Sequence, residues 1–251
     1  MGKVHEKFMK RFDIISIFPA SLDSYFNESI LARAQKKKLI SIKTHDLRKW
    51  ARDKHRKVDD KPYGGGAGMV MKIEPIYKAL RAFKALNVKA QITNVKSNPK
   101  SKILKTRVIL LAANGKQFTQ KDAMRLSKYE RLIFICGRYE GVDARVEKFV
   151  HEKISIGPYV VTGGELPAAI IIDAVARMIP GVVGKEESVR NESFSAISHS
   201  PLASGYLEHP HYTRPEVFIV NGKKYRVPKV LLGGNHRMIE VWRKGRSKAV
   251  R

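Results

Sequence analysis

The chain has 251 residues, of which 43% are hydrophobic and 8% aromatic, a composition that is typical of a globular protein and excludes a disordered one. No apolar run approaches the roughly 18 residues of a membrane-spanning helix, the polar and basic Met1–Arg11 is not a secretory signal, and the single cysteine, Cys136, excludes an internal disulfide framework and fits a reducing compartment. Lysine and arginine total 49 against 23 acidic residues, a formal net charge of +26, which favours nucleic acid as a partner; proteome-wide adaptation and an anionic membrane surface are the alternatives.

The first elements predicted are a strand, a helix and a second strand. Phe12–Phe18 is an isoleucine-rich run that ends at Pro19, and Leu39–Thr44 alternates apolar and polar residues. Ser21 is suited to cap a helix between these strands. The apolar face of that helix would comprise Leu22, Phe26, Ile30 and Ala34.

A polar loop and a glycine-rich turn come next. Arg48–Lys61 has no hydrophobic periodicity and is predicted to be a loop. Pro62–Met71 contains the run Gly-Gly-Gly-Ala-Gly, which suits a phosphate cradle, although it lacks the ending of a P-loop and an ordinary flexible loop is an equal alternative. Pro75 lies where a helix tolerates proline, near the start of a helix predicted over Ile76–Leu86.

Strand and helix signals then alternate, after a basic surface insertion at Asn87–Lys105. In chain order they predict a strand at Arg107–Ala113, a helix at Thr119–Tyr129, a strand at Leu132–Cys136, a helix at Val142–His151 and an apolar helix at Glu165–Ile179 that Pro180 and Gly181 end. Strands separated by helices indicate an α/β fold with a parallel sheet.

The last part of the chain is predicted to form a small separate domain. Val217–Val220 and Lys224–Val227 flank Asn221-Gly222, a strong hairpin signal. Asn235 can cap a short helix through Trp242, and the basic tail Arg243–Arg251 is expected to be frayed. We therefore predict an α/β domain at residues 1–183, an interdomain linker at 184–210 and a C-terminal domain at 211–251.

Two glycine-bearing loops are expected at one edge of the parallel sheet. Gly137–Gly141 and Ile156–Leu166 each connect a strand to a helix, and ligands of such sheets bind at the carboxyl ends of the strands. Together the two loops predict a pocket, whose ligand composition alone does not identify.

Three charged residues invite a functional interpretation beside a structural one. Asp173 and Arg177 are one turn apart on the apolar helix. They form either an ordinary ion pair or part of a functional site, because burying an arginine costs free energy unless the residue has a function or a full set of partners. Glu192, in the linker, would by itself be an ordinary solvated acid. The eight histidines show no metal-ligand spacing, so no metal site is predicted.

Several segments, in the right order and over nearly the whole chain, resemble one family: the bacterial tRNA (guanine-N1)-methyltransferases of the knotted SPOUT class (TrmD type). The resemblance is carried by Ile15–Pro19, Val58–Met69, Cys136–Asp143, Ser155–Gly157, Gly163–Ala168, Asp173–Arg177, Ile179–Val182, Pro210–Pro215 and Gly234–His236.

The resemblance implies a fold and a cofactor. The fold is a parallel-sheet α/β domain with a deep C-terminal trefoil knot. The protein is expected to be a cytoplasmic homodimer whose active site lies at the subunit interface, and no membrane association is expected. The cofactor is S-adenosylmethionine, with Mg²⁺ as a further dependence of family members. The cofactor-binding residues implied are Leu111, Gly137, Glu140, Gly141, Ile156, Gly157, Pro158, Tyr159, Val160, Val161, Gly163 and Gly164.

The resemblance also implies the reaction, which is methylation of N1 of the guanine 3′ of the anticodon, tRNA position 37. By the family pattern Glu192 is the general base and Arg177 stabilises the guanine O6, while Asp59, with His55 and Arg56, lies in the guanine-reading segment.

Three departures from the family pattern matter. The base is usually an aspartate, where this chain has Glu192; Pro158 replaces an aspartate in the second loop; and the C-terminal domain is expected to be shortened. The alternatives are therefore a tRNA-binding SPOUT-fold protein with weak or lost activity and, less favoured because Asp59 is present, a methyltransferase of ribosomal RNA.

Overall fold

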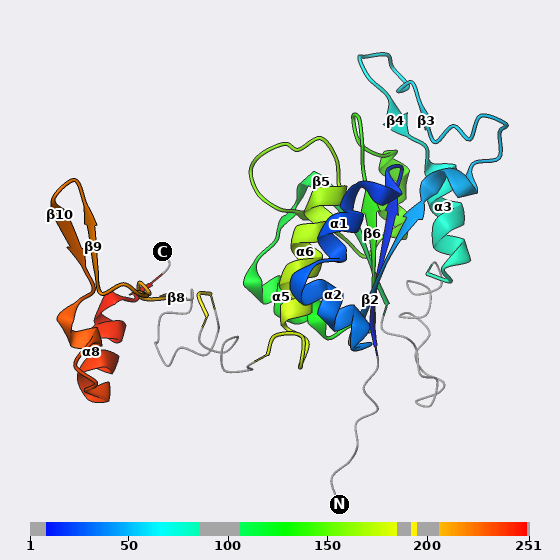
Figure 1. The fold of residues 1–251 in the computed structure, drawn as a ribbon. Helices are drawn as coiled ribbons and strands as arrows, with labels where there is room; N and C mark the ends of the chain where they lie inside the picture. Colours follow the sequence, from blue (N-terminus) through cyan, green and yellow to red (C-terminus); the bar gives the residue numbers. More distant parts are fainter. Residues whose placement is uncertain (1–8, 86–105, 185–191, 195–205, 250–251) are drawn as a thin grey trace, which may run out of the picture. The chain divides into compact units, whose positions relative to one another are not determined.

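The computed structural model describes residues 9–85, 106–184, 192–194 and 206–249 (Figure 1). These divide into two units, Met1–Gly184 and Lys185–Arg251, and each is described by itself. The predicted insertion at Asn87–Lys105 and most of the predicted linker at 184–210 lie outside the described residues.

The first unit is built on a five-stranded sheet whose described pairings are all parallel, as predicted. Its strands run in the order β2-β1-β6-β5-β7. They are β1 (Lys10–Ser16), β2 (Ile40–Asp46), β5 (Thr106–Gln117), β6 (Arg131–Cys136) and β7 (Glu152–Ser155). All six residues of β6 are buried, as expected of a central strand that is covered on both faces.

Alternating residues of the strands enter two different hydrophobic cores. Ile14 and Phe134 belong to one core, and their neighbours Ile15 and Ile135 belong to the other. The first core is closed by α1 (Asp23–Phe26), α2 (Ser29–Lys36), α5 (Gln120–Ser127) and α6 (Glu165–Arg177), and the second by η2 (Leu47–Trp50), α3 (Ile73–Ala82) and η3 (Ala144–Phe149). Figure 1 shows α1, α2, α5 and α6 together on one side of the sheet, so the unit has three layers. No helix among the described residues is long and apolar enough to cross a membrane.

The single continuous helix predicted after Ser21 was wrong, but residues of its predicted apolar face are buried. The segment forms a 3₁₀ turn, η1 (Pro19–Leu22), followed by α1 and α2, and Ser29, the first residue of α2, has a φ of 50°. Ser21 Oγ donates to the Phe18 carbonyl at 2.9 Å and therefore does not act as an N-cap. Phe26 and Ala34 are nevertheless buried in the first core, because the break in the helix keeps their face toward the sheet.

The α-helix predicted at Val142–His151 was also wrong, because the segment contains the shorter 3₁₀ helix η3, and the strand β7 follows it. Asp143 caps the turn by accepting a hydrogen bond from the Arg145 N–H at 2.9 Å. Glu152 is then held by Arg107 of β5 at 2.8 Å and by Arg125 of α5 at 2.7 Å. These contacts to distant elements hold β7 beside β5.

The region predicted as a loop and a glycine-rich turn contains short regular elements. Asp46 caps η2 by accepting a hydrogen bond from the Arg48 N–H at 3.0 Å, and α3 begins three residues before its predicted start, with Pro75 in its first turn. The glycine-rich turn connects β3 (Asp59–Asp60) to β4 (Val70–Met71), which pair antiparallel.

The second unit contains the predicted hairpin and helix. The hairpin comprises β9 (Val217–Val220) and β10 (Lys223–Arg226), and Asn221 and Gly222 have φ angles of 48° and 75°, as its tight turn requires. A 3₁₀ turn, η4 (Lys229–Leu231), precedes α8 (His236–Arg246). Asn235 caps α8 as predicted, since its side chain accepts from the Met238 N–H at 3.2 Å.

The frayed tail predicted from Arg243 was wrong over its described part. The helix α8 continues to Arg246, and β11 (Lys248–Ala249) then pairs antiparallel with β8 (Tyr206–Leu207). The pairing with a segment about forty residues earlier could not be seen in the local sequence pattern.

Lys10, at the start of β1, is buried at 4% exposure beneath the end of α5. Its Nζ donates to the carbonyl oxygens of Leu126 at 2.6 Å and Tyr129 at 2.5 Å, and burial lowers the pKa of Lys10 to about 7. Between about pH 7 and the ordinary lysine pKa the unfolded chain therefore binds one more proton than the folded chain. The free energy of unfolding should consequently rise with pH in this window, by at most about 1.4 kcal/mol per pH unit from this residue.

The Lys10→Met variant should lack this contribution. Denaturant unfolding of both proteins at pH 7, 8 and 9 measures it, because all other titrating groups cancel in the comparison. If the free energy of unfolding changed with pH in the same way for the two proteins, Lys10 would stay protonated in the folded state.

Candidate functional site

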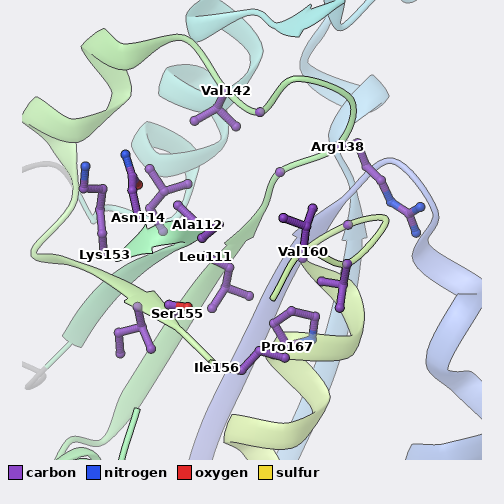
Figure 2. A pocket seen from close by; sticks show the side chains of 18 of the residues that line it. Leu111, Ala112, Asn114, Arg138, Val142, Lys153, Ser155, Ile156, Val160 and Pro167 are labelled. Atoms are coloured by element: carbon purple, nitrogen blue, oxygen red, sulfur yellow. The ribbon is translucent and has the colours of Figure 1, made fainter. Parts of the chain in front are cut away.

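A cavity of about 570 Å³ opens at the carboxyl ends of β6 and β7 and beside Leu110–Asn114 of β5. Figure 2 shows Asn114 and Lys153 on one side of it and Val160 and Pro167 on the other, with Leu111 between them. The cavity lies where the parallel sheet places the two predicted loops, at the edge at which such folds bind ligands.

Ten of the twelve residues proposed for the cofactor line this cavity. They are Leu111, Gly137, Glu140, Gly141, Ile156, Tyr159, Val160, Val161, Gly163 and Gly164. The other two, Gly157 and Pro158, are in the same loop but are not among the lining residues. Gly157 is buried, its backbone exchanges hydrogen bonds with Ser155 Oγ, and a Cβ there would overlap the Tyr159 ring, so it shapes the loop.

The twelve residues named for the cofactor omit several lining residues, among them Asn114, Lys153 and Thr162. Asn114 lies within β5, which is longer than predicted and whose pairing with β7 shifts register between Leu111 and Lys116. A polar residue just after a buried apolar run is the signal that points to such positions.

The two cavity loops are joined directly by their backbones. The Gly164 N–H donates to the Gly137 carbonyl at 2.9 Å, and Arg138 forms an isolated antiparallel bridge with Gly163. A Cβ on Gly164 would lie 2.6 Å from the Cys136 Cα, so only glycine permits this approach. Both loops therefore belong to one rigid rim.

The loop after β6 is supported from its outer side by β4. The Met71 N–H donates to the Gly141 carbonyl at 3.0 Å, and the Glu140 N–H donates to the Met69 carbonyl at 3.1 Å. These bonds place the glycine-rich turn next to the cavity as a support for its wall; none of its glycines lines the cavity.

The proposed guanine-reading segment reaches the cavity through Asp59. The pKa of Tyr139, a lining residue, is raised by partial burial and by the charge and hydrogen bond of Asp59. His55 and Arg56 lie in an exposed turn that Asp53 organises by accepting hydrogen bonds from the N–H groups of His55 and Lys57, both at 3.1 Å. The structure thus brings Asp59 to the rim, whereas His55 and Arg56 are available to a large ligand from solvent.

The two proposed catalytic residues belong to different units. Arg177 is the last residue of α6, and Asp173, one turn earlier, accepts a hydrogen bond from the Tyr25 hydroxyl at 2.7 Å. Glu192 is half-buried in the second unit, next to Ser193, whose Oγ accepts from the Glu208 N–H at 3.0 Å. The carboxylate of Asp173 therefore has a partner on α1, which the sequence did not reveal.

No three histidine, cysteine, aspartate or glutamate side chains within the described ranges come together as a metal site. We accordingly assign no residue to Mg²⁺.

Known proteins similar to this chain carry the name of one family of tRNA-modifying enzymes. The family described as tRNA (Guanine-1)-methyltransferase TrmD matches residues 9–250. A tRNA (guanine-N(1)-)-methyltransferase of Dictyoglomus turgidum is 48% identical over 94% of this chain and 84% of that protein. Proteins of the same name from Carboxydothermus hydrogenoformans and Endomicrobium trichonymphae are 47% and 42% identical, over 94% and 93% of this chain and 82% and 92% of theirs. The chain belongs to the tRNA (guanine-1)-methyltransferase TrmD family.

Proposed function

We propose that this protein is an S-adenosylmethionine-dependent tRNA (guanine-N1)-methyltransferase that acts on the guanine 3′ of the anticodon, position 37. The observation that carries the proposal is the cavity at the strand ends, formed by the two loops whose motifs match the family. A volume of about 570 Å³ is in the range of small-molecule sites.

The residues present fit S-adenosylmethionine. Apolar side chains such as Leu111 and Val160 can cover an adenosine, and closely apposed loop backbones offer N–H and C=O groups to its polar atoms. Glu140 supplies a carboxylate for its amino group. When bound, the methyl donor supplies an electrophilic methyl group.

Guanine N1 must lose its proton before it is a good nucleophile. We assign proton acceptance to the Glu192 carboxylate, which converts N1 to a form that can attack, and stabilisation of the charge on O6 to Arg177. Asp59 accepts a hydrogen bond from the guanine edge, and His55 and Arg56 contact the RNA beside it.

We propose that the enzyme is a homodimer with its active site at the subunit interface. The support is a stripe on α6: Leu166 and Ile170 are 56% and 41% exposed on a helix that is otherwise mostly buried, and Asp173 and Arg177 continue the same stripe at helical spacing. A partner that covered Leu166 and Ile170 would also cover Arg177. By the family pattern alone, the linker that carries Glu192 acts across this interface.

The remaining parts of the proposal follow the family. The knot lies at the C-terminal end of residues 1–183, residues 184–210 link the domains, and residues 211–251 bind tRNA. A cytoplasmic location fits this substrate. The charge of +26 supports an RNA partner.

The test is methyl transfer from labelled S-adenosylmethionine to anticodon stem-loops. A stem-loop with guanine 3′ of the anticodon should be labelled at N1, and one with adenine there should not. Binding without transfer would favour the alternative of a tRNA-binding protein with lost activity, and labelling of both stem-loops would contradict the assigned position.

Arg177→Ala should lower kcat by about tenfold or more, because it removes the charge proposed to stabilise O6. Single-turnover kinetics with saturating tRNA and S-adenosylmethionine measure the loss. Arg33→Ala, at an exposed position of α2, is the control and should leave kcat unchanged. An unchanged kcat with a lower Tm would show that Arg177 has only a structural role.

A further inference from the structure

A buried acid at the start of α6 connects the cavity to the end of β1. Glu165 is 3% exposed, and its carboxylate accepts a hydrogen bond from Ser16 Oγ at 2.5 Å and pairs with Arg138 Nε at 2.9 Å. Ser16 Oγ in turn accepts from the Phe18 N–H at 2.8 Å. One carboxylate thus joins β1, the loop after β6 and α6.

The Arg138 side chain extends this connection to the second cavity loop. Its Nη1 donates to the Thr162 carbonyl at 3.3 Å, and its guanidinium lies 4.7 Å from the centre of the Phe18 ring. Figure 2 shows the Arg138 side chain directed away from Leu111 and Asn114. Arg138 is one of the residues that line the cavity, and its Nε and Nη1 are engaged by Glu165 and by the Thr162 carbonyl.

Gly163 leaves the path that the Arg138 side chain takes. A Cβ on Gly163 would lie 2.5 Å from the Arg138 Cδ and closer still to Nε. The arginine therefore crosses the second loop in direct contact with its backbone, and a side chain at this position would displace it.

A buried ion pair of this kind is weak evidence for stability, because removing two charges from water offsets their attraction. Its geometric effect is larger: a guanidinium has donors on separate nitrogens in a fixed plane, so Nε holds Glu165 while Nη1 holds the Thr162 carbonyl, a spacing that the single nitrogen of an ammonium does not reproduce. We propose that Arg138 and Glu165 are positioning residues, which hold the loops 137–141 and 156–164 at the separation that the methyl donor requires. This inference rests on the proposed function, in which the cavity binds S-adenosylmethionine.

Arg138→Lys and Glu165→Gln test the proposal. The Kd and the KM of S-adenosylmethionine should each rise about tenfold, while kcat at saturating S-adenosylmethionine falls less than about threefold, since the reacting groups are untouched. Arg145→Lys is the matched control, because Arg145 also pairs with a carboxylate, Asp143 at 2.6 Å, but joins no second loop. Unchanged Kd and KM in both variants would overturn the proposal.

Amide hydrogen exchange gives a readout that does not depend on activity. In Arg138→Lys the amides of the two loops, including the Gly164 N–H bonded to Gly137, should exchange about tenfold faster, with β1 and β6 unchanged. Faster exchange across the whole sheet would mean that the pair only stabilises the fold, and would overturn the proposal. If the unchanged protein binds no S-adenosylmethionine, the proposed function fails, while exchange in the loops still decides whether the pair fixes them.

A double-mutant cycle provides a second test. Gly163→Ala should raise the Kd of S-adenosylmethionine as Arg138→Lys does, because the new Cβ displaces the guanidinium. In an Arg138→Ala background the same change should have little further effect. An equal effect in both backgrounds would show that the Cβ acts on the methyl donor directly, and would contradict the proposal.

Discussion

Glu192→Gln should slow methyl transfer by about a hundredfold or more while leaving the Kd of S-adenosylmethionine near its original value. The amide has nearly the shape of the carboxylate but cannot accept the N1 proton at neutral pH, so the loss falls on the chemical step. Single-turnover rates with saturating tRNA measure it, and calorimetry with S-adenosylmethionine measures cofactor binding separately.

Two further variants make this result specific. Glu208→Gln, another acid of the second unit, should retain full activity. Glu192→Asp restores the residue usual in the family and should be neutral or faster, since the extra methylene displaces the carboxylate by about 1 Å. If Glu192→Gln keeps most of the activity, a different group accepts the proton.

Binding of tRNA should weaken steeply with salt, by on the order of several hundredfold between 50 and 200 mM for about six phosphate contacts. Each neutralised phosphate contributes a slope of roughly −0.7 to −0.9 in the logarithm of the association constant against the logarithm of salt. Affinity for S-adenosylmethionine should change far less, because the cavity relies on backbone groups and apolar walls. Filter binding at a series of salt concentrations measures both slopes.

The basic insertion at Lys89–Lys105 and the basic segment from Arg243 onward are the regions expected to contact the RNA. Arg243→Gln combined with Arg246→Gln, in the last turn of α8, should reduce the slope by about one to two units. Lys36→Gln with Lys37→Gln, at exposed positions at the end of α2, removes the same charge and should leave the slope unchanged. Equal effects of the two pairs would show that only the overall charge matters.

The elements predicted well were those encoded in adjacent residues. The apolar runs of β1, β5 and β6 and the turn at Asn221-Gly222 each depend on a local pattern that the structure reproduces. The elements predicted wrongly depend on contacts between distant residues. α8 is followed by β11 and not by a frayed tail, because β8 is available to pair.

The candidate site shows the same division. Loops rich in glycine after buried strands indicated the cavity correctly, since parallel strands end at one edge. The hydrogen bond from Tyr25 to Asp173 and the pairing of Arg138 with Glu165 were not predicted, because neither partner of a side-chain contact reveals the other in the sequence. The roles of Glu192 and Arg177 come from the family resemblance alone.

The order of the strands has a consequence for the growing chain on the ribosome. β1 and β2 are made early and can pair at once, but the other edge of β1 must wait for β6. The carboxylate of Asp13, in β1, meets its partner Arg131 only after 118 further residues have been added. Until then an apolar strand edge stays open, so slow synthesis over this interval would expose the nascent chain to association with its neighbours.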